Sequence, residues 1–102
     1  MTPEMVGGHE NVYALRVKGD SMIDALVNDG DIVLLQSASS ARNGEMVAAW
    51  LKSEQEATLK KFYQEDDQVR LQPANQTMAP IYTAPGNVEI QGKVIYTFRD
   101  LS

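Results

Sequence analysis

The sequence predicts a mostly-β fold, in which a small, bent and partly barrel-like antiparallel sheet carries one short helix. Six or seven short segments are alternating or rich in β-branched residues, and turn residues separate them. Only residues 22–27 show a short helical pattern of apolar side chains. Because no long helical segments alternate with the strands, a layered α/β arrangement is disfavoured.

The predicted strands follow one another at short intervals. They cover residues 12–17, 32–35, 46–51, 57–63, 69–72 and 88–98. The first strand alternates, so that Tyr13, Leu15 and Val17 share one face, whereas the second is apolar throughout and predicts a buried strand. Asn43-Gly44 predicts a turn, and residues 54–56 predict a charged turn between two strands.

The end of the chain is less regular before its last strand. Pro73 stops the fifth strand, and residues 74–85 predict an irregular surface excursion. Gly92 lies inside the long final strand and predicts a bulge or a bend. Residues 1–11 are expected to form a flexible lead-in, and residues 12–102 a single small domain.

Composition excludes several kinds of site. Cysteine is absent and His9 is the only histidine, which removes disulfides, a thiol nucleophile and cysteine-type zinc sites. A Ser-His-Asp triad would have to use His9, in the polar lead-in, and is disfavoured. We predict no metal and no cofactor. The lack of cysteine suits a reducing, cytoplasmic location.

Net charge and hydropathy indicate whether the domain binds nucleic acid or enters a membrane. The formal net charge is −5 at pH 7, and the lysines and arginines are scattered rather than gathered in a basic stripe. We therefore expect no direct binding of nucleic acid by this domain. The longest apolar run, residues 46–51, is far shorter than the ~20 residues that cross a bilayer, and no signal segment begins the chain, so a soluble domain is expected.

Ser21 is the candidate nucleophile. It lies between Gly19, which permits an unusual turn, and the first apolar residues of the short helical segment. Backbone N–H groups at such a position can point at a developing oxyanion. The alternative interpretation of Ser21 alone is a helix N-cap.

The candidate base is a lysine in the segment 57–63. A lysine must be neutral to accept a proton, and lowering its pKa from ~10.4 to ~7 needs an apolar, water-poor setting. Alternation places Thr58 and Lys60 on one face of the strand, where Thr58 could orient the amine, and Lys61 on the other. Periodicity alone does not select Lys60 over Lys61. The alternative for either lysine is an ordinary solvated side chain.

An ordered set of motifs resembles the C-terminal domain of the LexA-type self-cleaving repressors, which include UmuD and the lambdoid phage repressors. The matching segments are 15–22 (Leu-Arg-Val-Lys-Gly-Asp-Ser-Met), 29–31 (Asp-Gly-Asp), 42–49 (Arg-Asn-Gly-Glu-Met-Val-Ala-Ala), 58–62 (Thr-Leu-Lys-Lys-Phe), 71–75 (Leu-Gln-Pro-Ala-Asn) with 80–81 (Pro-Ile), and 90–95 (Ile-Gln-Gly-Lys-Val-Ile). They run in the family's order from about residue 13 to the end.

The resemblance implies a serine peptidase with a mostly-β fold. Ser21 would be the nucleophile and Lys60 the general base, because the family's lysine follows a threonine and an apolar residue. The backbone N–H groups of Asp20 and Ser21 would be the oxyanion donors, with Thr58 and Met22 in supporting roles. The resemblance also implies a homodimer through the C-terminal strand region Val88–Phe98, and activation by a RecA filament.

Family members cleave a peptide bond in their own hinge, of Ala-Gly type in LexA and Cys-Gly type in UmuD. Neither dipeptide occurs in these 102 residues, and only twenty residues precede Ser21. The cleavage loop and the DNA-binding domain of the family are thus expected to be missing, so that this domain would cleave in trans or only dimerise.

Three alternatives differ in function. One is a UmuD-like processed subunit, or a catalytically silent dimerisation module that binds a polymerase. A second is the catalytic domain of a type I signal peptidase, which is less well supported because Ile23-Asp24 replaces the proline that commonly follows its Ser-Met pair. The third, a β domain without activity, leaves the ordered motifs unexplained.

Overall fold

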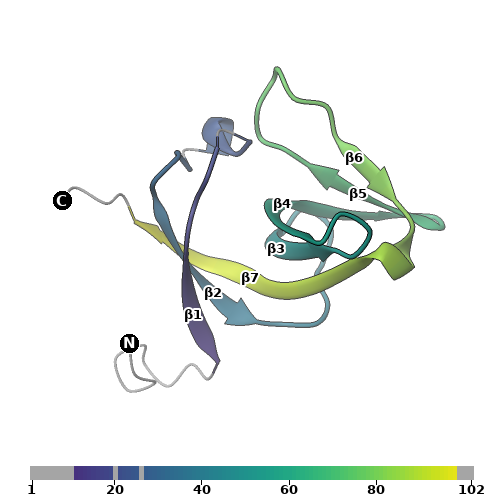
Figure 1. The fold of residues 1–102 in the computed structure, drawn as a ribbon, viewed down its shortest axis with the longest axis horizontal. Helices are drawn as coiled ribbons and strands as arrows, with labels where there is room; N and C mark the ends of the chain where they lie inside the picture. Colours follow the sequence, from purple (N-terminus) through teal and green to yellow (C-terminus); the bar gives the residue numbers. More distant parts are fainter. Residues whose placement is uncertain (1–10, 20, 26, 99–102) are drawn as a thin grey trace.

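The computed structural model describes residues 11–19, 21–25 and 27–98, and within them the chain forms a seven-stranded antiparallel sheet (Figure 1). The strands are β1 (Val12–Arg16), β2 (Ile32–Ser37), β3 (Met46–Leu51), β4 (Glu56–Glu65), β5 (Gln68–Gln72), β6 (Ile81–Thr83) and β7 (Val88–Phe98). Two short 3-10 helices, η2 (Ile23–Ala25) and η3 (Pro85–Asn87), complete the regular structure of these residues. The mostly-β prediction is confirmed.

The last strand lies in the middle of the sheet. The strand order is β1-β2-β7-β3-β4-β5-β6, so β7 joins the β1–β2 hairpin to the meander from β3 to β6. Figure 1 shows β7 crossing β1 and β2 and then curving beneath β3 and β4 as it runs from one side of the molecule to the other. The sheet bends but does not close, because β1 and β6 remain as its two edges.

Two bulges accompany the bend of β7. Leu34 pairs with Tyr96 but Leu35 with Val94, which leaves Ile95 as an extra residue on β7. On the other side of β7, Ala48 pairs with Gly92 but Ala49 with Ile90, which leaves Gln91 unpaired. An extra residue bends a strand and increases its twist. The bulge predicted near Gly92 is therefore present at the neighbouring residue.

The interior of the fold consists of two groups of buried side chains. The first core cluster comprises Val17, Met22, Val27, Val33, Leu35 and Ala48, and the second comprises Val47, Ala49, Leu51, Phe62, Val69 and Leu71. Strand β3 contributes to both clusters, because its successive side chains point to opposite faces and both faces are covered. This explains why its sequence is apolar throughout.

Three local predictions need correction. Within the described residues, the helix predicted over residues 22–27 is the 3-10 helix η2, in which the N–H of Ala25 bonds to the carbonyl of Met22, three residues back. Glu56 belongs to β4 and not to the preceding turn. The excursion predicted over residues 74–85 contains β6, a three-residue strand that forms by pairing with β5.

The lead-in predicted for residues 1–11 lies outside the described residues, except for Asn11. Within the described ranges, no helix combines the length and the hydropathy that a bilayer span requires. In the same part of the chain, no group of three or more His, Cys, Asp or Glu side chains is arranged to hold a metal ion.

Candidate active site

Ser21 lies on the turn that leads from β1 into η2, which we call the nucleophile turn (residues 17–25). Backbone hydrogen bonds hold the start of this turn, from the N–H of Val17 to the carbonyl of Asp31 at 2.7 Å and from the N–H of Gly30 to the carbonyl of Val17 at 2.8 Å. Gly19 has φ of +84°, which favours glycine, and its N–H donates to Oδ1 of Asp29 at 2.7 Å. The turn is thus fixed by the Asp29-Gly30-Asp31 segment.

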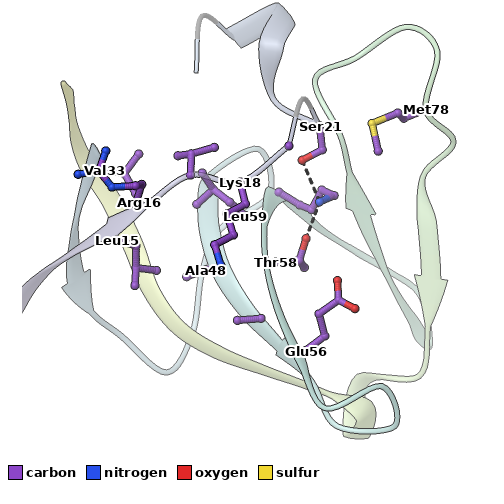
Figure 2. A pocket seen from close by; sticks show the side chains of 14 residues that line it. Leu15, Arg16, Lys18, Ser21, Val33, Ala48, Glu56, Thr58, Leu59 and Met78 are labelled. Carbon is purple, nitrogen blue, oxygen red and sulfur yellow. Dashed lines mark hydrogen bonds between the residues drawn. The ribbon is translucent and has the colours of Figure 1, made fainter. Parts of the chain in front are cut away.

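Lys60 reaches Ser21 from β4. Its Nζ donates to Oγ of Ser21 at 3.1 Å and also to Oγ1 of Thr58, as Figure 2 shows. The two residues are 39 positions apart in sequence. Only 7% of the Lys60 surface is exposed, although lysine is among the residues least often buried. The structure therefore brings the predicted nucleophile and the predicted base within hydrogen-bond distance.

Burial lowers the pKa of the Lys60 amine below its ordinary value, because the charged form is poorly solvated there. The carboxylate of Glu56 has a smaller opposite effect and raises the pKa of the same amine. The net shift of the Lys60 pKa is downward. A general base needs this direction of shift to work near neutral pH.

The strand register separates Lys60 from Lys61. Lys60 pairs with Val47 and Thr58 with Ala49, both of which belong to the second core cluster, so Lys60 and Thr58 share that face. Lys61 follows directly and therefore points to the opposite face, where it is half-buried. The predicted alternation along this strand is confirmed, and Lys60 is the lysine that contacts Ser21.

Met22 and Asp24 connect the nucleophile turn to the loop between β5 and β6 (residues 73–80, the β5–β6 loop). The N–H of Asp24 donates to the carbonyl of Ala74 at 2.6 Å, and the N–H of Ala74 donates to Sδ of Met22 at 3.4 Å. The N–H of Gln76 donates to Oδ2 of Asp24 at 3.0 Å. Met22 is 1% exposed, so it also anchors the turn in the first core cluster.

A cavity of about 520 Å³ opens at the contact between Ser21 and Lys60. Its lining comes from the end of β1 and the nucleophile turn, from Val33 of β2 and Ala48 of β3, from the first half of β4, and from Met78 of the β5–β6 loop (Figure 2). Ser21, Thr58 and Lys60 all face it. The cavity is large enough to take several residues of a peptide chain.

The first half of β4 has an open edge along this cavity. β5 pairs with residues 61–65 of β4, and among the described residues no strand pairs with residues 56–60 on that side. The N–H of Phe62 and its carbonyl both bond on the β3 side, to Glu45 and Gly44. Alternation then directs the backbone N–H and C=O of Ala57 and Leu59 toward the open edge.

Two residues of the site were missed by the sequence analysis. Glu56 shares the face of Thr58 and Lys60, and the period of two could have found it had the strand been extended by one residue. Met78 lies in an irregular loop, and no local pattern indicated it. The predicted oxyanion donors remain a prediction, because Asp20 lies outside the described residues.

Comparison with known proteins agrees with this geometry. A family model described as Peptidase S24-like matches residues 1–95. The LexA repressor of Herpetosiphon aurantiacus is 55% identical over 104 residues, which cover 99% of this chain and 49% of that protein. The LexA repressor of Roseiflexus sp. is 54% identical over 92 residues, 90% of this chain and 42% of that protein. That of Halalkalibacterium halodurans is 46% identical over 99 residues, 97% of this chain and 46% of that protein.

The chain thus spans about half the length of the curated relatives it matches. The family match extends over most of the residues, including the nucleophile turn, β4 and the greater part of β7. Taken with the buried lysine beside a serine, it leads to one conclusion: the chain belongs to the Peptidase S24-like family.

Proposed function

We propose that this chain is the peptidase and dimerisation domain of a LexA-type repressor of the SOS response, a serine endopeptidase that cleaves a hinge peptide bond. Ser21 is the nucleophile and Lys60 the general base. The observation that carries the proposal is the 3.1 Å contact between Nζ of the buried Lys60 and Oγ of Ser21. The names of the relatives, all LexA repressors, support the assignment to a repressor.

The reaction follows from the two side chains. Neutral Lys60 removes the proton of the Ser21 hydroxyl while Oγ attacks the carbonyl carbon of the scissile bond. The resulting lysine ammonium donates that proton to the leaving amine, and the acyl group remains on Ser21 as an ester. A water molecule, deprotonated by Lys60, then hydrolyses the ester. Thr58 accepts a hydrogen bond from Nζ and so orients the amine toward Ser21.

The open edge of β4 suits an extended peptide as the substrate. The backbone groups of Ala57 and Leu59 can pair with an added strand, which is a common way for proteins to hold extended peptides. Such a strand would run beside Lys60, with one of its carbonyl groups near Ser21. The Ala-Gly dipeptide of the family's hinge does not occur in these 102 residues. A hinge peptide added in trans is therefore the substrate used to test the proposal.

Homodimerisation through β7 belongs to the same proposal. Ile95, Tyr96 and Phe98 are 40%, 60% and 39% exposed. These exposed fractions are high for three large apolar side chains that lie close together on one strand. The rings of Tyr96 and Phe98 pack with centroids 4.9 Å apart. Activation by a RecA filament and a cytoplasmic location accompany the assignment to the LexA type.

The proposal is tested with a peptide that spans an Ala-Gly hinge, incubated with this domain between pH 6 and 10. We expect hydrolysis whose rate rises about tenfold per pH unit until the pKa of Lys60 is passed, because only the neutral amine can accept the proton. Ser21→Ala and Lys60→Ala should each lower the rate by about a thousandfold or more.

Lys61→Ala is the matched control, because it removes the neighbouring amine from the opposite face and should leave the pH profile unchanged. Hydrolysis that survives Lys60→Ala would refute the role of that lysine. If the wild-type domain binds the peptide but hydrolyses it at no pH, the silent dimerisation module is the better description, and the exposed side chains of β7 favour it as the second candidate.

A further inference from the structure

Met78 stands apart from the other residues around the cavity. It belongs to the β5–β6 loop, and Figure 2 shows it beyond Ser21, across the cavity from β1. Its surface is 42% exposed although it is large and apolar. The remaining lining residues come from the nucleophile turn and from β1 to β4. Met78 thus forms a separate wall of the cavity.

The β5–β6 loop holds this wall in place. Oδ1 of Asn75 accepts hydrogen bonds from both the N–H and the hydroxyl of Thr77, at 2.9 and 2.7 Å. The N–H of Met78 donates to the carbonyl of Asn75 at 3.1 Å. The backbone around Met78 is therefore folded into a compact turn, and the side chain leaves it toward the cavity.

The loop is also bonded to the nucleophile turn. The carboxylate and the N–H of Asp24 bond to Gln76 and Ala74, respectively, so the base of the loop is fixed to the turn that carries Ser21. The backbone at the base of the loop is therefore held against the turn that carries the Ser21 hydroxyl. Met78 and Ser21 line the same cavity, so a substrate placed for attack by Ser21 occupies a space that Met78 borders.

We propose that Met78 determines the specificity of the cleft by contacting one substrate side chain near the scissile bond and favouring an apolar one. The inference rests on the proposed peptidase function and assigns a substrate preference to it. The methionine side chain is unbranched, apolar and adaptable, so it packs against aliphatic groups of different shapes. It offers neither a charge nor a strong hydrogen-bond partner to a polar side chain.

The test replaces Met78 by a charged residue, which should change the preferred substrate side chain from apolar to basic. A set of hinge peptides carries Leu, Lys or Asp at each position in turn around the Ala-Gly bond, and kcat and KM are measured for the wild type, Met78→Glu and Ala79→Glu. In Met78→Glu we expect the Lys peptide to gain and the Leu and Asp peptides to lose about three- to tenfold in kcat/KM, at one position only, mainly through KM.

Ala79→Glu is the control, because it adds the same charge to the next exposed residue of the loop, outside the cavity lining. A general electrostatic effect would act in both variants and at all peptide positions. If Met78→Glu changes no single-position preference, or changes it no more than Ala79→Glu does, the proposal is wrong.

Binding separates this inference from the peptidase function. The same peptides, labelled with a fluorophore, are titrated into the Ser21→Ala variant with and without Met78→Glu, and the dissociation constants are read from anisotropy. A preference for Lys over Asp at one position that appears only with Met78→Glu supports the role of Met78 even if the wild type hydrolyses nothing. Equal affinities for all peptides in both proteins would overturn it.

Discussion

At the scale of single residues, the site depends on two opposing effects on the pKa of the Lys60 amine. Burial of Lys60 favours its neutral form, while the Glu56 carboxylate favours the charged form. Glu56 is exposed, so its effect is screened by solvent and remains the smaller of the two. The working pH of the proposed base is therefore adjustable without any change to the two residues in contact.

Replacing Glu56 tests this balance. In Glu56→Gln the pKa of Lys60 should fall further, because the charge that raises it is gone. The neutral fraction of Lys60 at pH 7 then increases, and hydrolysis of the hinge peptide should accelerate by up to a few-fold at pH 7. The gain should vanish above the pKa of Lys60, where the amine is neutral in both proteins. The pH profile of kcat/KM measures the shift.

Glu54→Gln provides the comparison, because Glu54 lies in the adjoining β3–β4 turn, is exposed, and contributes nothing to the pKa of Lys60. A profile shifted to higher pH in Glu56→Gln, or the same shift in both variants, would contradict the electrostatic role of Glu56.

The sequence identified much of this site because strand alternation is a local property. It placed Thr58 and Lys60 on one face, as the register now shows. It proposed a lysine of the same segment as the base for Ser21 but could not place the two side chains together, because a contact across 39 residues depends on how the sheet bends. The choice of Lys60 over Lys61 came from the family resemblance. Met78 was missed for the same reason, since its place at the cavity follows from hydrogen bonds to a distant turn.

At the scale of elements, β7 is the most constrained strand. Gly92 pairs with Ser37 on one side and Ala48 on the other, next to a bulge. A Cβ on Gly92 would lie 2.5 Å from Oη of Tyr13 and 3.0 Å from the carbonyl oxygen of Gln36. The glycine is thus required by close packing between strands, and its backbone needs no positive φ.

Gly92→Ala should lower the free energy of unfolding by about 1–3 kcal/mol, the usual cost of overpacking a core position. Tyr13→Phe in the same chain should recover part of this loss, because it removes the nearest atom but leaves the Gln36 carbonyl. Urea denaturation of the single and double variants gives both values.

Gly86→Ala serves as the reference for Gly92→Ala, because a Cβ there would meet no atom within 4 Å. Equal stability of the two alanine variants would show that the close approach at Gly92 relaxes without cost.

Long strands with a clear sequence pattern were predicted well, whereas a short strand that depends on pairing with a neighbour was not. The bounds of β3 and β7 agree with the sequence analysis, because one is an uninterrupted apolar run and the other a long β-rich segment. β6 has three residues, too few to show a period, and it exists through its pairing with β5. The helix expected over residues 22–27 is the 3-10 helix η2 among the described residues, and Asp24 bonds to the β5–β6 loop, a contact that the local pattern does not reveal.

At the scale of the whole molecule, the bent sheet separates two surfaces. The cavity beside Ser21 and Lys60 opens between β1, β4 and the β5–β6 loop. The exposed aromatic side chains of Tyr96 and Phe98 lie on β7 at the end that pairs with β2. A second copy could cover these aromatic residues, so dimerisation and access to the cavity are separable properties.

Tyr96→Asp should weaken the proposed homodimer at least about tenfold, because it places a charge within an apolar contact. Sedimentation equilibrium over a range of concentrations measures the dissociation constant, and hydrolysis of the hinge peptide in trans should be retained.

Tyr82→Asp is the matched control for the dimer measurement. Tyr82 is 55% exposed but lies on the edge strand β6, which three strands separate from β7. A dimer equally strong in Tyr96→Asp and the wild type would place the interface elsewhere.

The central position of β7 also has a consequence for the time at which the site forms. Ser21 lies between the two strands of the β1–β2 hairpin and Lys60 belongs to the β3–β4 hairpin, and β7 is the strand that joins these two hairpins into one sheet. A ribosome makes both side chains well before it reaches residue 98. Under the proposed function, a nascent chain therefore carries its nucleophile and base apart until its last strand has emerged, and the order of translation itself delays hydrolysis until the fold is complete.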